Sequence, residues 1–105
     1  MSKVNISVDT EPYNDRRYGK PWIATVTFEQ GSKATFHWGD WIGRAGEPGV
    51  LELQASVGDV VATGQKDFRN PRGTRCEYSI VEPDGSLTEV DKVDAYKHWK
   101  EVTNG

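Results

Sequence analysis

The chain has 105 residues, a mass of 11.7 kDa, a formal net charge of -3 and a sequence pI near 5.3. This length predicts one domain with a single hydrophobic core, and it excludes a core combined with a deep, enclosed cofactor cavity. The acidic balance argues against a general affinity for nucleic acid or for an anionic membrane surface.

The cysteine and histidine content argues against a disulfide-bonded protein and against a structural zinc protein. The single cysteine, Cys76, cannot form an internal disulfide, and two histidines with one cysteine do not supply the four ligands of a structural zinc site. The first residues lack the apolar run of a signal peptide, and no stretch approaches the roughly 18 apolar residues of a membrane span. We therefore expect a cytoplasmic protein with no metal, no cofactor and no membrane partner.

Alternation of polar and apolar residues predicts the strands of the first half. Residues 3–8 predict a first strand, residues 9–20 a loop, and residues 22–28 and 33–38 the two strands of a β-hairpin. Because side chains on a strand switch sides at every residue, one face of this hairpin carries its large rings. We expect the following rings to lie in the core: Trp22, Phe28, Phe36 and Trp38.

In the second half, glycines and a proline predict a loop over residues 40–49. Strand patterns follow at residues 50–55, 60–62, 76–82 and 87–90, with turns at 57–59 and 83–86.

The last predicted element is a helix over about residues 91–102. Asp91 is a suitable N-cap, and the apolar residues Val93, Tyr96 and Trp99 follow at helical spacing. Residues 1–105 thus predict one mainly β (α+β) domain. Its architecture is a small antiparallel β-barrel or sandwich of six to seven short strands with one C-terminal helix.

The clearest functional signal is a basic, turn-rich stretch between Gly64 and Arg75 in this otherwise acidic chain. It combines one large ring with four cations and one anion, namely Phe68, Lys66, Arg69, Arg72, Arg75 and Asp67. The turn formers at residues 70–73 favour an exposed loop. A second basic and aromatic group lies in the early loop: Arg16, Arg17 and Tyr18. Together the two segments predict a binding surface, unless neighbouring glutamates neutralise these cations in an ordinary solvated loop.

Trp41 is a further candidate binding residue. Trp38 and Trp41 stand three residues apart around Gly39, so that one can enter the core while the other lies on the surface as an interface anchor. The alternative is that both rings are in the core.

The sequence contains no recognisable catalytic motif. His37 is predicted to be an exposed strand histidine, the glycines at residues 43–46 lack the spacing of a phosphate-binding loop, and the carboxylates are dispersed. We assign no catalytic residue and expect a protein that is not an enzyme.

Four segments carry a resemblance to a family of proteins: residues 20–24 (KPWIA), 38–43 (WGDWIG), 58–69 (GDVVATGQKDFR) and 95–99 (AYKHW). Together they resemble a group of small bacteriophage and prophage proteins with no established activity or site residues. Compact phage accessory proteins of this size often bind a host protein, as anti-defence or host-takeover factors do. The resemblance thus implies binding to a host or phage protein in the bacterial cytoplasm.

The sequence therefore predicts a small non-enzymatic binding protein that contacts an acidic protein surface through residues 64–75 and Trp41. One alternative is a domain that binds single-stranded nucleic acid on the same basic and aromatic surface. Another is an enzyme or ligand-binding protein for a small metabolite. A homodimer is also possible, with apolar residues 50–55 as the pairing edge.

Overall fold

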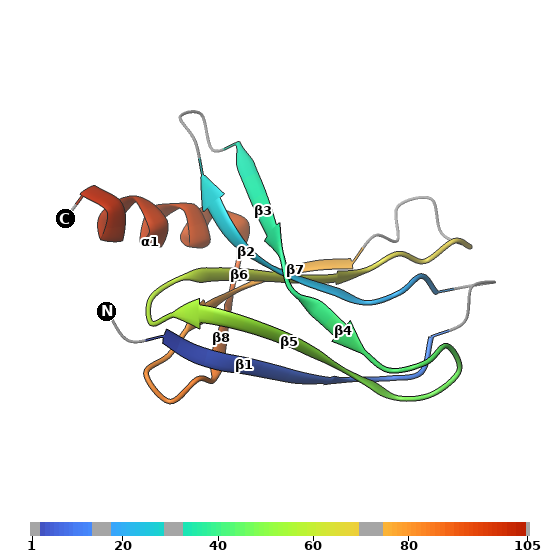
Figure 1. The fold of residues 1–105 in the computed structure, drawn as a ribbon. Helices are drawn as coiled ribbons and strands as arrows, with labels where there is room; N and C mark the ends of the chain where they lie inside the picture. Colours follow the sequence, from blue (N-terminus) through green and yellow to red (C-terminus); the bar gives the residue numbers. More distant parts are fainter. Residues whose placement is uncertain (1–2, 14–17, 29–32, 70–74, 105) are drawn as a thin grey trace.

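Two antiparallel sheets and one helix make up the part of the chain that the computed structural model describes, which is residues 3–13, 18–28, 33–69 and 75–104 (Figure 1). The strands within these residues are β1 (Lys3–Thr10), β2 (Trp22–Phe28), β3 (Ala34–Trp38), β4 (Asp40–Ile42), β5 (Gly49–Ser56), β6 (Val60–Gln65), β7 (Arg75–Val81) and β8 (Leu87–Val90). The helix α1 spans Lys92–Asn104.

The strands form a three-stranded sheet, β1-β5-β4, and a five-stranded sheet, β3-β2-β6-β7-β8. The mainly β, α+β fold with antiparallel strands and a C-terminal helix is thereby confirmed. The sheets are not closed into a barrel, and the arrangement fits the sandwich. The prediction of six to seven strands missed β4, which lies in the segment expected to be a loop. This strand is only three residues long and lies between glycines, so it shows no alternation.

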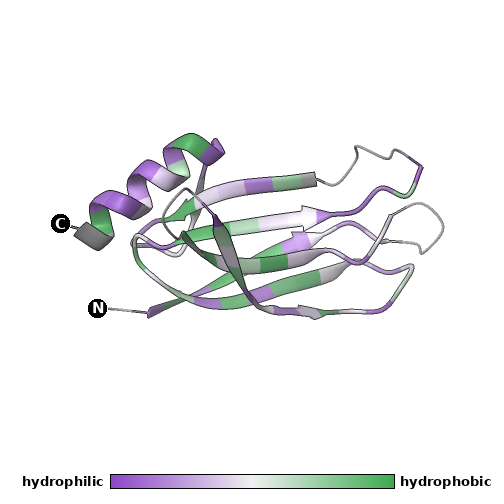
Figure 2. Cartoon of the chain, turned by 90° about the horizontal axis from the view of Figure 1, so that it is seen from above, coloured by the Kyte–Doolittle hydropathy of each residue, from purple (hydrophilic) through white to green (hydrophobic). Residues whose placement is uncertain are grey.

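The core has two parts, one on each face of the five-stranded sheet. Ile23, Val61 and Val81 pack between the two sheets against Ile6 and Leu51 of the smaller sheet. On the opposite face, Ala95 of the helix forms a second cluster with four strand residues: Val26, Phe28, Val60 and Ala62. Figure 2 shows the helix at one end of the strands, so it covers only part of that face.

Gly39 is the point at which the chain leaves one sheet for the other. β3 is an edge strand of the five-stranded sheet, and β4 is an edge strand of the three-stranded sheet. The amide of Gly39 donates a hydrogen bond to the carbonyl of Ile23 at 2.8 Å. A Cβ atom at this position would lie 2.6 Å from the carbonyl oxygen of Glu52. Only a glycine fits at this crossover between the two sheets.

Both predicted turns are present. Gly58, with φ of 91°, follows β5, and Gly85, with φ of 85°, precedes β8. His98 of the helix lies against the first turn, where its Nε2 is 2.7 Å from the carbonyl oxygen of Gly58. This contact ties α1 to the β5–β6 turn.

Three expectations about individual residues were wrong. Trp38 is 63% exposed, although it lies on the predicted face of the hairpin, because the helix does not reach it. Val93 is 62% exposed, and the helix instead buries Ala95 and half-buries Tyr96 and Trp99. The predicted pairing edge at residues 50–55 belongs to β5, which is the middle strand of its sheet.

The helix start gives a first testable prediction. The amide of Asp94 donates to Oδ1 of Asp91 at 2.7 Å, as expected for an N-cap. Asp91→Ala is expected to lower the free energy of unfolding by about 1 kcal/mol, whereas Asp91→Ser retains most of it. Urea denaturation of both variants measures this difference. Equal loss in the two variants would show that the side-chain oxygen does not stabilise the helix.

Candidate functional site

Two segments far apart in the sequence meet at the end of the sandwich opposite the helix. Tyr18 forms a β-bridge with Asp67, and the amide of Gly19 donates to the carbonyl of Lys66 at 2.7 Å. The side-chain amide of Gln65 donates back to the carbonyl of Gly19 at 3.0 Å. We call the surface formed by residues 18–20 and 66–69 the distal end.

The distal end presents an exposed ring and exposed cations. Phe68 is 50% exposed, and the ammonium group of Lys66 lies 5.4 Å from the centre of its ring. Arg69 is also exposed, and its amide donates to Oδ1 of Asp67 at 3.0 Å, which fixes the local turn. Lys20 is exposed as well. The bridge to residues 18–19 therefore holds a cation-flanked aromatic ring in solvent.

The structure thus brings Tyr18, Lys66, Phe68 and Arg69 together, as the sequence interpretation required. Arg16, Arg17 and Arg72 lie outside the described residues, and so does the side chain of Arg75, whose backbone belongs to β7. Their roles in the predicted surface stay predictions.

Trp41 is held by its surroundings. Its Nε1 donates to Oγ1 of Thr10 at 3.4 Å, and Tyr13 contacts its ring edge-on at 5.0 Å between centroids. The ammonium group of Lys20 lies 5.3 Å from the ring centre, which joins Trp41 to the distal end. Gly49 packs so closely on the indole that no side chain fits there. The ring is half-buried, so it packs against the distal end and does not project into solvent as an anchor.

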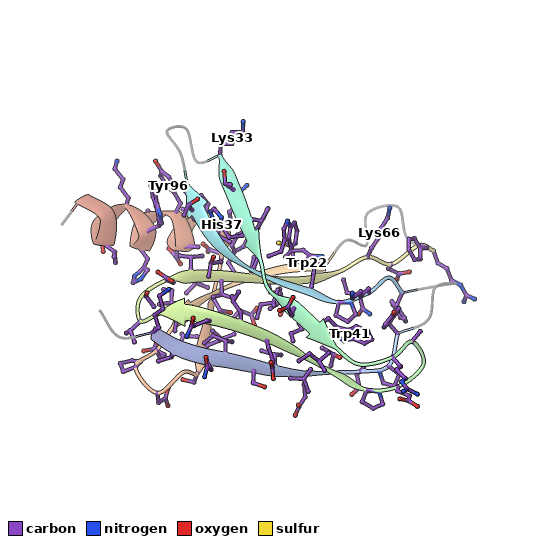
Figure 3. All side chains as sticks on the ribbon, viewed as in Figure 1. Trp22, Lys33, His37, Trp41, Lys66 and Tyr96 are labelled. Atoms are coloured by element: carbon purple, nitrogen blue, oxygen red, sulfur yellow. The ribbon has the colours of Figure 1, made fainter. Side chains whose placement is uncertain are left out.

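The sequence interpretation missed a second surface, which we call the aromatic strip: Trp22, Phe36 and Trp38. Trp22 and Trp38 meet edge-to-face at 5.2 Å between centroids, and Phe36 stacks on Trp38 at 5.6 Å. The strip lies beside the part of the five-stranded sheet that α1 covers. Figure 3 shows Tyr96 of the helix, Trp22 and Lys66 in this order along the sandwich. The strip therefore lies between the helix and the distal end.

On the face that carries the strip, the described residues of the paired strands carry no charge. The strand residues that point to this side, by the register of the ladders, are Trp22, Ala24, Val26, Phe28, Ala34, Phe36, Trp38, Val60, Ala62, Gly64, Cys76, Tyr78, Ile80, Thr88 and Val90. Burial, and then the neighbouring Cys76, raises the pKa of the Tyr78 phenol above its ordinary value, so this phenol stays neutral in physiological conditions.

The alternation of apolar residues in Trp22–Phe28 and Ala34–Trp38 could have revealed the strip. It could not have revealed that the helix leaves the strip uncovered.

Open grooves flank the Gly39 crossover. A groove of about 570 Å³ is lined by residues 5–7 of β1, by residues 52–54 of β5, and by Trp38, Gly39 and Asp40. A smaller one of about 270 Å³ lies between Lys20, Trp22 and Trp41. The charged groups that line the larger groove are Asp40 and Glu52, both acidic.

Groups suited to catalysis do not converge in the described part of the chain. Across those residues, no three His, Cys, Asp or Glu side chains cluster in a way that holds a metal ion. His37 is exposed, as predicted, and its Nε2 lies 3.2 Å from the hydroxyl of Thr27. α1, the helix within the described ranges, is too short and polar to cross a membrane.

Comparison with known proteins identifies no similar protein. The chain matches no known family model, no curated protein and no solved structure.

Proposed function

We propose that this chain is a small binding protein that acts without catalysis and contacts an acidic surface of another protein through its distal end. The observation that carries this proposal is Phe68. Its ring is 50% exposed beside Lys66 on a loop that a β-bridge and two hydrogen bonds tie to residues 18–19. A large exposed ring on a fixed support loses little conformational entropy when a partner covers it.

The roles within the distal end follow from general interface energetics. Buried aromatic anchors supply much of the affinity of an interface, whereas charges at its rim mainly increase the association rate and select the partner. We assign the anchor role to Phe68 and the rim role to Lys66, Arg69 and Lys20. The resemblance to phage accessory proteins supports a host protein in the bacterial cytoplasm as the partner.

Single-stranded nucleic acid fits the described surface less well. Proteins that bind single strands combine aromatic stacking rings with a basic groove that follows the phosphates. Here the aromatic strip lies on a sheet face whose strand residues carry no lysine or arginine. The exposed ring of the distal end, Phe68, is instead the one that has cations beside it, namely Lys66 and Arg69.

Affinity capture tests the proposal. Wild type and the double variant Phe68→Ala/Arg69→Ala are immobilised and exposed to a nuclease-treated bacterial lysate. We expect a specific protein on the wild type that the double variant loses at least about tenfold, which corresponds to the roughly 1.4 kcal/mol or more expected for an aromatic anchor. The matched control is Lys92→Ala/Val93→Ala, which removes an exposed cation and a 62% exposed apolar side chain from the helix at the other end.

Equal recovery of the partner by wild type and by the distal variant would contradict the proposal. A labelled oligothymidylate serves as the nucleic-acid probe in a parallel measurement of fluorescence anisotropy. Saturable binding whose affinity falls steeply with salt, with a log–log slope of about 0.7 per phosphate contact, would favour single-stranded nucleic acid instead.

A further inference from the structure

The free edge of β3 is the least protected strand edge in the described part of the chain. β3 has β2 on one side and no described strand on the other (Figure 1). Natural edge strands commonly carry charges or prolines that prevent pairing with other chains. The edge strand β8 carries Glu89, β4 carries Asp40, and β1 carries Lys3 and Asp9. Residues 34–38 of β3 (ATFHW) contain no acidic residue, no lysine, no arginine and no proline.

The hydrogen-bond register shows which backbone groups this edge exposes. The amide of Gly39 points toward β2, where it bonds to Ile23. In an antiparallel ladder the N–H and C=O groups of one residue point to the same side and alternate along the strand. The same groups of His37 and Thr35 therefore face β2, and those of Ala34, Phe36 and Trp38 face outward. These are also the residues whose side chains lie on the uncharged face.

We infer that two copies of the chain pair antiparallel through their β3 edges, and that this pairing brings the two aromatic strips side by side on one face of the joined sheet. In a two-fold arrangement centred on Phe36, the two Phe36 residues face each other, and Ala34 of each copy faces Trp38 of the other. The same order already exists within the chain, where Trp38 lies opposite Ala24 and Phe36 opposite Val26. A small residue thus lies opposite each indole, which leaves room for the ring.

The charges flanking β3 favour this register. Lys33 is exposed next to Ala34, and Asp40 is exposed two residues beyond Trp38. In the paired register Lys33 of one copy lies opposite Gly39 of the second copy, beside its Asp40. Each copy has a formal charge of -3, so a contact built on the neutral strand and flanked by opposite charges avoids the repulsion between the two acidic chains.

The pairing is isologous, because both copies contribute the same surface, and so it stops at a dimer. It joins the two five-stranded sheets into one continuous sheet with the two aromatic strips side by side. The distal ends stay free, since they lie at the far end of β6 and not on β3. This inference therefore stands or falls independently of the proposed function.

The test is the mass in solution as a function of concentration, measured by sedimentation equilibrium. The wild-type mass is expected to rise from 11.7 kDa toward twice that value as the concentration increases. Trp38→Lys places two extra cations in the contact and is expected to weaken the dimer at least about tenfold, as for an aromatic anchor. Ala34→Pro removes an outward-facing amide at the first residue of the strand, where proline is tolerated, and it is expected to weaken the dimer similarly.

The matched control is Ile42→Lys, which changes a 55% exposed aliphatic side chain on β4. It is expected to leave the dimer unchanged. A wild-type mass that stays at 11.7 kDa up to about 0.5 mM, where a Kd of 1 mM would still be visible, would overturn the inference. A dimer that both β3 variants leave intact, or that Ile42→Lys weakens equally, would overturn it as well.

Discussion

Phe28→Ala is expected to lower the free energy of unfolding by about 3–5 kcal/mol, which is the usual range for a buried Phe→Ala change. Phe28 is 2% exposed. Its ring meets Tyr96 at 5.4 Å and Trp99 at 5.8 Å between centroids, and both are residues of α1. The alanine leaves a cavity between the sheet and the helix, so α1 is also expected to exchange its amide hydrogens faster. Chemical denaturation and hydrogen exchange measure the two effects.

The exposed ring of Phe68 provides the control for this prediction. Phe68→Ala removes the same atoms from a side chain that is 50% exposed, and it is expected to change the stability by no more than about 0.5 kcal/mol. Similar losses in both variants would contradict the assignment of Phe28 to the core and of Phe68 to the surface.

Gly39→Ala is the second change with a large expected effect, a loss of about 1–3 kcal/mol from overpacking. The added Cβ would lie 2.6 Å from the carbonyl oxygen of Glu52 and 2.9 Å from Cγ2 of Ile23. The backbone cannot simply move away, because the amide of Gly39 is bonded to the carbonyl of Ile23 at 2.8 Å. The clash is therefore expected to strain the crossover from β3 to β4, where the two sheets are connected.

Gly19→Ala is the matched control, since the nearest atoms to its Cβ would be the ring of Phe68 at 3.4 Å and Lys66 Cβ at 3.5 Å. These are ordinary contacts, so its thermal midpoint is expected to stay close to that of the wild type. A Gly39→Ala variant as stable as Gly19→Ala would show that the crossover between the sheets does not require a glycine.

Local alternation was enough to predict most of the strands. Residues 22–28 and 33–38 predicted β2 and β3 almost to their ends, because their side chains repeat with the period of a strand. The pairing of β2 with β6 had no such signal, since it joins residues that are some forty positions apart in the chain. Strand order is a property of these non-local contacts.

The aromatic residues show why the two binding surfaces were harder to predict. Alternation placed Trp38 on the correct side of the hairpin, but its exposure depends on how far α1 extends over that face. Trp41 lies only three residues further along the chain, yet Thr10, Tyr13 and Gly49 from distant segments hold it half-buried. The meeting of Tyr18 with Asp67 likewise depends on the fold as a whole.

The central claim is that the distal end binds a partner protein through the ring of Phe68. The affinity of the purified captured partner for wild type and for Phe68→Ala tests this claim most directly. Calorimetry at physiological salt is expected to show a Kd at least about tenfold weaker for Phe68→Ala, with the same stability as the wild type. An unchanged Kd would contradict the assignment of this ring as the anchor and would move the contact to another surface of the protein.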